Sequence, residues 1–282
     1  MPDRRPSGED RPIKVCLAIA GSDSGGGAGI QADLKAFAAA GVHGTTAITA
    51  LTAQNTVAVT AVEAVSPAMV LAQVRAVAED LGVDAVKVGM LGSVATTEAV
   101  AQALSELAPG TPVVVDPVMV AESGARLLER DAEAALRELI VPRASVVTPN
   151  VPEARALAGD GDAELDGAAL ARAVHALGPG AVVLTGGHRE QAIDVLFDGE
   201  RAIEIAGERH PDGAAHGSGC THSSTLAAHL ALGAGLEDAA RAARAAAGAA
   251  VRDGLRELGA GPGPVDVLGL RARLLGGPAR VT

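Results

Sequence analysis

The chain has 282 residues, a formal net charge of −11, neither Trp nor Tyr, and two cysteines. The negative charge argues against nucleic acid as the main partner, because phosphate-backbone contacts need clustered Lys and Arg. Two cysteines are too few for a disulfide framework, and no apolar run has transmembrane length. We therefore expect a cytoplasmic protein that acts on small molecules and has no membrane partner.

The domain organisation follows from the same sequence-level features. Residues 1–12 are polar and contain proline, so we expect a flexible N-terminal tail there. The rest of the chain contains no linker or internal repeat, and its length suits one large α/β domain. The expected domain therefore spans residues 13–282.

Apolar runs rich in Val and Ile alternate with alanine-rich helical patterns along this domain. The expected strands are Lys14–Ala20, Thr45–Leu51, Ala85–Val88, Val113–Val115, Ser145–Thr148 and Ala181–Leu184. The expected helices are Gly29–Ala40, Pro67–Leu81, Thr96–Leu107, Asp131–Leu139, Gly167–Leu177, Gly219–Leu232 and Glu237–Leu258. Segments Asp194–Phe197 and Ala202–Ile205 predict an antiparallel hairpin at a sheet edge. The alternation predicts a mostly parallel sheet covered by helices on both faces.

Unusual residues follow several of the expected strands. A glycine-rich loop, residues 21–29, comes after the first strand, and residues 185–188 come after the sixth. The loop fits neither a P-loop nor a dinucleotide fingerprint, because Gly27 and Ile30 occupy the positions of the required lysine and glycine. Ligands of open α/β sheets bind at the carboxyl ends of the strands, so we expect the functional site at this edge.

A short glycine-bearing turn, residues 216–222, runs directly into an alanine-rich helical pattern. The backbone N–H groups of Gly217, Gly219 and Cys220, with the positive end of the helix dipole, predict an anion hole for a transferring phosphoryl group. We expect the same dipole to lower the pKa of Cys220 toward the thiolate, which indicates a nucleophile or a base.

Asp33 and Gln54 are polar residues whose positions suggest contact with a ligand. Asp33 shares a helical face with Ile30 and Phe37, so it either has a salt-bridge or capping partner or faces the ligand pocket. Gln54 follows a strand, and its primary amide can read the donor–acceptor edge of a ring such as an aminopyrimidine.

Oxygen-bearing side chains suggest a place for a hard cation. Asp116 ends a strand, Asn150 ends another, and Glu153 lies in the first turn of the helix that follows. Carboxylate and amide oxygens are the ligands that Mg²⁺ uses, often through retained waters, although Glu153 could also serve only as a helix-dipole carboxylate. We expect Asp116 and Glu153 to be the metal ligands.

Seven ordered segments resemble the ribokinase-like superfamily, and specifically the hydroxymethylpyrimidine and phosphomethylpyrimidine kinases of thiamine biosynthesis. They are AGSDSGGGAGIQADLK (20–35), TALTAQNT (49–56), KVGML (87–91), DPVM (116–119), TPNVPEA (148–154), TGGH (185–188) and HGSGCT (216–221). The segment GPGPVDVL (261–268) is similar to the closing segment of that family. The resemblance extends from about Lys14 to Val267 and implies a three-layer α/β/α sandwich.

The resemblance also implies a set of site residues. The pyrimidine would lie against Gly21, Ala28, Asp33, Gln54, Met90 and Val118. ATP would lie over residues 185–187 and the turn at 217–220, with Asn150, Glu153, Thr185 and Gly187 as nucleotide contacts and Mg²⁺ at Asp116 and Glu153. Many pyrimidine kinases carry lysine where this chain has Thr185. Related kinases are commonly dimers, which implies a homodimer.

Cys220 stands where many sugar kinases of the superfamily carry an aspartate base, which points to the pyrimidine and pyridoxal branch. We therefore expect a Mg-ATP kinase that acts on 4-amino-5-hydroxymethyl-2-methylpyrimidine and then on its monophosphate. The alternatives are a pyridoxal kinase and a non-catalytic sensor of the pyrimidine on the same fold.

Overall fold

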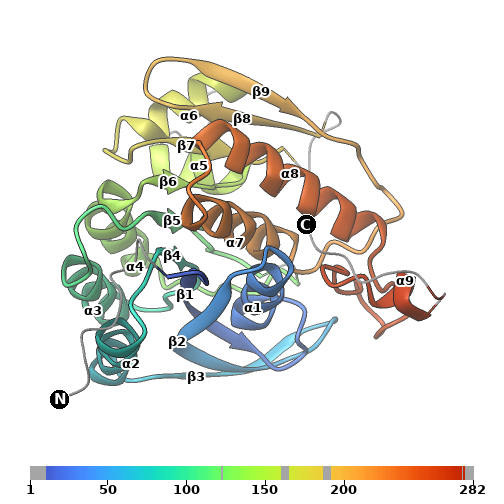
Figure 1. The fold of residues 1–282 in the computed structure, drawn as a ribbon, viewed down its shortest axis with the longest axis horizontal. Coiled ribbons are helices and arrows are strands. Elements are labelled where there is room, and N and C mark those ends of the chain that lie inside the picture. The colour runs from blue at the N-terminus through green and yellow to red at the C-terminus, as the bar shows by residue number, and fades with distance from the viewer. Residues whose placement is uncertain (1–10, 122, 160–164, 187–191, 275, 277–282) are drawn as a thin grey trace.

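The computed structural model describes residues 11–121, 123–159, 165–186, 192–274 and 276 of the protein (Figure 1). The predicted tail at residues 1–12 falls outside this part of the chain, apart from residues 11 and 12. No helix among the described residues is both long enough and apolar enough to span a bilayer.

The described strands form one nine-stranded sheet in the order β3-β2-β1-β4-β5-β6-β7-β8-β9. The strands are β1 (Val15–Asp23), β2 (His43–Gln54), β3 (Val59–Ala64), β4 (Ala85–Val88), β5 (Val113–Val115), β6 (Val146–Val147), β7 (Val182–Leu184), β8 (Ile193–Phe197) and β9 (Ala202–Ala206). Strands β2, β1, β4, β5, β6 and β7 are mutually parallel, whereas β3 and the β8–β9 hairpin pair antiparallel at the two ends. The mostly parallel sheet and its edge hairpin confirm the sequence prediction.

Helices cover both faces of this sheet, giving three layers (Figure 1). One face carries α1 (Gly29–Ala39), α7 (Ser218–Ala231) and α8 (Leu236–Arg252). The other carries α2 (Pro67–Asp80), α3 (Val94–Ser105), α4 (Arg130–Ala135), α5 (Val151–Ala158) and α6 (Gly167–His175). A short helix, α9 (Leu270–Leu274), lies near the C-terminal end.

The two cores follow from the two-residue period of the strands. In β1, Leu17 and Ile19 pack against the face of α2–α6, while Cys16, Ala18 and Ala20 pack against the face of α1, α7 and α8. Burial of these apolar side chains on both faces stabilises the sheet between the helices.

The order of the strands reverses next to β1. The chain passes from β1 outward to β2 and β3 and then returns to form β4 on the other side of β1. Such a reversal opens a crevice at the carboxyl ends of the two adjacent strands. The loops that follow β1 and β4 are therefore placed to form a ligand site.

Several element bounds differ from those expected, including the helix expected over Asp131–Leu139, which is α-helical over Arg130–Ala135 and continues as a π-helix over Leu136–Ile140. The helix expected to end at Leu258 ends at Arg252, because Gly254 packs tightly against Ala214: a Cβ at position 254 would lie 2.5 Å from the Cβ of Ala214. The edge strand β3 was not expected, since most of its residues are exposed and show no apolar alternation.

Candidate active site

A cleft of about 420 Å³ opens at the carboxyl ends of the parallel strands. Twelve of the predicted site residues line it: Gly21, Ala28, Gln54, Met90, Asp116, Val118, Asn150, Glu153, Thr185, Gly217, Gly219 and Cys220. Asp33 does not line it, and Gly187 lies outside the described residues. The fold thus gathers residues that are far apart in the sequence at one place.

The glycine-rich loop after β1 is wrapped around the buried carboxylate of Asp23. This carboxylate accepts hydrogen bonds from the backbone N–H groups of Gly25 (2.8 Å), Gly27 (3.0 Å) and Ala28 (2.9 Å). The Nε2 atom of His216 lies 3.0 Å from its Oδ2 atom. Burial acts against the charge, but the hydrogen bonds of His216 and of the amides outweigh it and hold the pKa of Asp23 below its ordinary value.

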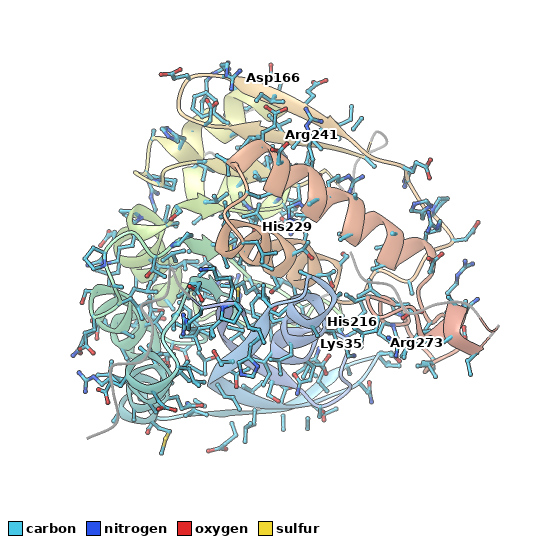
Figure 2. All side chains as sticks on the ribbon, viewed as in Figure 1. Lys35, Asp166, His216, His229, Arg241 and Arg273 are labelled. Carbon is cyan, nitrogen blue, oxygen red and sulfur yellow. The ribbon has the colours of Figure 1, made fainter. Side chains whose placement is uncertain are left out.

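The start of α7 fits directly against this loop. Gly217 precedes the helix at φ +87°, and a Cβ there would lie 1.8 Å from the carbonyl oxygen of Gly27. A Cβ on Gly27 would lie 2.1 Å from the ring of His216. Figure 2 shows His216 in the same region as Lys35 of α1, whose Nζ donates to the carbonyl oxygen of Gly26 at 2.6 Å. The glycine loop and the phosphate-binding turn predicted at 217–220 are therefore in direct contact.

Cys220 lies in the first turn of α7, half-buried at the cleft. Burial raises the pKa of its thiol to about 12, against the attraction of the Lys87 ammonium and a hydrogen bond of the Gly29 amide. The prediction that the helix dipole lowers this pKa is wrong, because the loss of hydration outweighs the favourable charges. The thiol of the free protein is therefore protonated at neutral pH.

Asp33 forms a salt bridge with Lys87, which was one of the two possibilities that the sequence left open. Its Oδ1 atom lies 3.0 Å from Nζ of Lys87, and Ser224 Oγ donates to the same oxygen at 2.7 Å. Both charged side chains are completely buried. The expectation that Asp33 faces the ligand is wrong, because α1 directs this carboxylate into the layer between the sheet and α7.

Asn150 and Glu153 form a capping box at the start of α5. The Asn150 side chain accepts from the Glu153 N–H, and the Glu153 carboxylate accepts from the Asn150 N–H, both at 2.9 Å. Burial raises the pKa of Glu153 to about 8, and the negative charge of Asp116 adds to this effect.

Two cleft-lining carboxylates that repel each other in this way fit a divalent cation, because its charge would relieve the repulsion. Asp116 and Glu153 would supply the oxygen ligands. The capping box leaves this fit intact, since it engages only one oxygen of Glu153 through the Asn150 amide.

A second His–Asp pair, Asp194 and His222, also lines the cleft and was not predicted. Asp194 accepts from the Gly186 N–H at 2.8 Å, and its Oδ2 atom lies 3.2 Å from Nε2 of His222. The Arg244 guanidinium is 3.9 Å from its Oδ1 atom and donates to the Ala192 carbonyl at 2.7 Å. Asp194 thereby fixes the backbone of Gly186, the residue after Thr185.

Lys87 and Asp23 also line the cleft without having been singled out. A lysine within the apolar run Ala85–Val88 was the available signal for one, and the aspartate inside a glycine-rich loop was the signal for the other. The partners of Asp194 come from α7 and α8, so no local pattern marked that residue.

The chain matches the family described as phosphomethylpyrimidine kinase over residues 23–266. It belongs to this family. The hydroxymethylpyrimidine/phosphomethylpyrimidine kinase of Rhizobium meliloti (strain 1021) is 50% identical over 259 residues, which cover 89% of this chain and 96% of that relative. The match confirms the resemblance seen in the seven motifs.

Two further proteins extend the similarity within this group of kinases. The thiamine biosynthesis bifunctional protein ThiED of Geobacter sulfurreducens is 45% identical over 258 residues, covering 90% of this chain and 52% of that protein. The crystal structure of an ADP complex of Bacillus subtilis pyridoxal kinase superimposes with a TM-score of 0.83 at 39% identity, covering 92% of this chain and 99% of that one. The ribokinase-like α/β/α fold is thereby confirmed.

Proposed function

We propose that this protein transfers the γ-phosphoryl group of ATP to 4-amino-5-hydroxymethyl-2-methylpyrimidine and then to the resulting monophosphate, for thiamine biosynthesis. The observation that carries the proposal is one cleft in which the glycine turn at 217–220 and the Cys220 thiol adjoin the glycine loop around Asp23. The names of the relatives support the acceptor, and the ADP complex of the pyridoxal kinase supports the nucleotide.

The acceptor half of the cleft comprises Gly21, Ala28, Gln54, Met90 and Val118. The Thr52 hydroxyl lies within hydrogen-bond distance of the Ser22 carbonyl oxygen (3.0 Å) and of Gln54 Oε1 (3.1 Å), so the Gln54 amide nitrogen is the group proposed to donate to a ring nitrogen of the pyrimidine. Gly21 keeps this half open, because a Cβ there would lie 3.0 Å from the sulfur of Met90. A flat heteroaromatic ring with acceptor nitrogens fits such a lining.

The nucleotide half comprises Asn150, Glu153, Thr185 and the turn at 217–220. The amides of Gly217, Gly219 and Cys220 and the helix dipole would stabilise the transferring phosphoryl group in both reactions. Gly187, two positions after Thr185 in the sequence, is proposed as a further nucleotide contact. Bound Mg²⁺ would neutralise part of the phosphate charge, with Asp116 and Glu153 holding it.

The two transfers place different demands on Cys220. In the first, Cys220 must lose its own thiol proton to solvent before it can act as a base, because the thiol is protonated in the free protein. The acceptor O–H bond then breaks, its proton passes to the Cys220 thiolate, a new P–O bond forms, and the bond to ADP breaks. In the second, the acceptor is a phosphate monoester whose second pKa lies near 6, so it is already anionic at neutral pH. We infer that Cys220 acts as a base only in the first transfer.

The test is a product-resolved assay with Mg-ATP that offers hydroxymethylpyrimidine, its monophosphate and pyridoxal in parallel. The proposal expects the monophosphate and then the pyrophosphate of the pyrimidine. Transfer to pyridoxal alone would favour the second candidate, which the similarity to the Bacillus subtilis pyridoxal kinase keeps open. Absence of any transfer, with pyrimidine binding retained, would indicate a sensor.

We also propose a homodimer that acts in the cytoplasm, where ATP is available. Large apolar side chains are exposed on and beside the β2–β3 edge, with 50% exposure at Leu51 and 48% at Val62. A second copy that covers this edge would remove them from water. Sedimentation equilibrium of wild type and Val62→Glu tests the dimer: a wild-type monomer would contradict it.

A further inference from the structure

Lys87 is a buried cation for which the sequence patterns indicated no role. All residues of β4 are buried, and Lys87 itself is 0% exposed. Val86 and Val88 pack against the helices α2–α6, so the side chain of Lys87 points to the opposite face, where α7 contacts β4. Lys87 also lines the cleft. Burial of an ammonium is costly, so its position needs a physical explanation.

Two carboxylates lie close to this ammonium. Nζ is 3.0 Å from Oδ1 of Asp33 and 3.7 Å from Oδ2 of Asp116. Ser224 Oγ donates to Asp33 at 2.7 Å, and Ser223 Oγ donates to Asp116 at 3.1 Å. Because both serines belong to α7, the cation is fixed between α1, the end of β5 and the helix that carries the thiol.

The charge of Lys87 is permanent and acts on Cys220. Burial disfavours the ammonium, but Asp33, Cys220 and Asp116 outweigh that effect and raise the pKa of Lys87. For Cys220, burial raises the pKa, and the attraction of Lys87 is the strongest influence in the opposite direction. Lys87 is therefore the main charged side chain that favours the thiolate form of Cys220.

Neutralising the negative charge of Asp33 is not by itself a sufficient reason for burying the Lys87 ammonium here. The Lys87 ammonium carries three N–H donors, and Asp33 Oδ1 at 3.0 Å with Asp116 Oδ2 at 3.7 Å does not saturate them, whereas a purely structural pair needs saturated donors to be favourable. Lys87 lines the cleft and Asp33 does not. Gly89 also keeps space for the ammonium, since a Cβ there would lie 2.7 Å from Nζ.

We propose that Lys87 is a positioning residue of the first phosphoryl transfer, whose fixed positive charge stabilises the negative charge that develops beside Cys220 as the acceptor hydroxyl attacks. The inference rests on the proposed function of Cys220. A buried charge is effective in this role because water does not screen it and it needs no reorganisation during the reaction. It acts through Cys220 and the attacking oxygen, without a bond to either substrate.

The experiment uses a charge-compensated pair of substitutions in the full chain. Lys87→Met with Asp33→Asn removes the cation and its buried partner charge together, and Asp33→Asn alone keeps the cation. We expect the pair to fold, with the acceptor KM within about threefold of wild type and kcat of the first transfer reduced at least about 100-fold. We expect Asp33→Asn to lose at least tenfold less activity than the pair.

A second measurement follows the reactivity of the thiol itself. Cys16 is completely buried, so iodoacetamide alkylation at a fixed neutral pH reports on Cys220. We expect alkylation at least tenfold slower in the pair than in Asp33→Asn. If kcat and the alkylation rate of the pair equal those of Asp33→Asn, Lys87 serves only to neutralise the charge of Asp33 and the proposal is wrong.

The alkylation rate separates this proposal from the proposed function, because it needs no substrate. A wild type that phosphorylates none of the three acceptors would refute the kinase assignment, while the comparison of alkylation rates would still decide whether Lys87 acts on the thiol. If the pair does not fold, the two single variants Asp33→Asn and Lys87→Met are compared instead. Equal losses of alkylation rate in the two variants would overturn the proposal, and a far larger loss of alkylation rate in Lys87→Met would support it.

Discussion

The proposed acceptor half and the proposed nucleotide half of the cleft each have a His–Asp pair beside them, but the two pairs are satisfied to different degrees. Asp23 accepts from three backbone amides and pairs with His216. In the second pair, Asp194 Oδ2 and both ring nitrogens of His222 lack a well-aligned hydrogen bond within the described residues. The comparison indicates that backbone hydrogen bonds preorganise the loop around Asp23 more strongly than the region around Asp194.

Cys220 lies between the two halves, and its removal gives the largest expected effect. Cys220→Ala should lower kcat of the first transfer by about 10²–10⁴-fold, the usual contribution of a general base. The second transfer should lose less than about tenfold, because its acceptor is already anionic. Separate assays starting from the alcohol and from the monophosphate measure the two losses; equal losses would contradict this division.

Gly217 lies where the turn at 217–220 contacts the glycine loop, and Gly219 provides a matched control within the same turn. Gly217→Ala should lower the free energy of unfolding by at least about 1–3 kcal/mol, because its φ is positive and the Cβ would overlap Gly27. A Cβ on Gly219 would meet no atom closer than 4.0 Å, so Gly219→Ala should keep wild-type stability. Urea unfolding measures both, and similar losses would show that the contact with Gly27 is unimportant.

The same substitution in the two aspartates tests the comparison directly. Asp23→Asn should lower the free energy of unfolding by about 2–3 kcal/mol and raise the pyrimidine KM, because an amide cannot accept all of the hydrogen bonds that the carboxylate accepts. Asp194→Asn should cost only about 1 kcal/mol and should raise the ATP KM instead, since His222 can exchange its ring proton and accept from the new amide. Reversed KM effects would refute the assignment of the two halves.

Glu153 tests the metal site through the pH dependence of stability. Its pKa of about 8 lies above the ordinary value of 4.5, so the folded protein binds the extra proton. The associated stability is complete below pH 4.5 and is lost as the pH rises through 8, by at most about 1.4 kcal/mol per pH unit. Thermal unfolding between about pH 6 and 9 should show this loss in wild type and not in Glu153→Gln. Added Mg²⁺ should oppose the loss only in wild type; an equal response of both proteins would argue against a metal at Glu153.

Much of the fold could be predicted because the central strands are continuous apolar runs. The bounds of β4 and β5 match their predictions, because buried parallel strands consist almost entirely of apolar residues. The exposed β3 gave no such signal. In the site, glycine turns and strand-end polar residues marked the lining, whereas the partners of Asp33 and Asp194 depend on helices that pack from distant parts of the chain.

The prediction for Cys220 failed for a related reason. The helix start is visible in the sequence, but the loss of hydration that raises the thiol pKa depends on how α1, β4 and α7 close around the sulfur. Local electrostatics could be anticipated from the motif, and burial could not.

The contact of Gly217 with Gly27 has a thermodynamic consequence. The loop proposed to surround the acceptor and the turn proposed to meet the phosphates are coupled by His216 and by the close approach of the two backbones, so they must move together. A ligand that orders one side therefore lowers the entropic cost of ordering the other. The two substrates should bind with positive cooperativity, and by reciprocity each should raise the affinity for the other by the same factor.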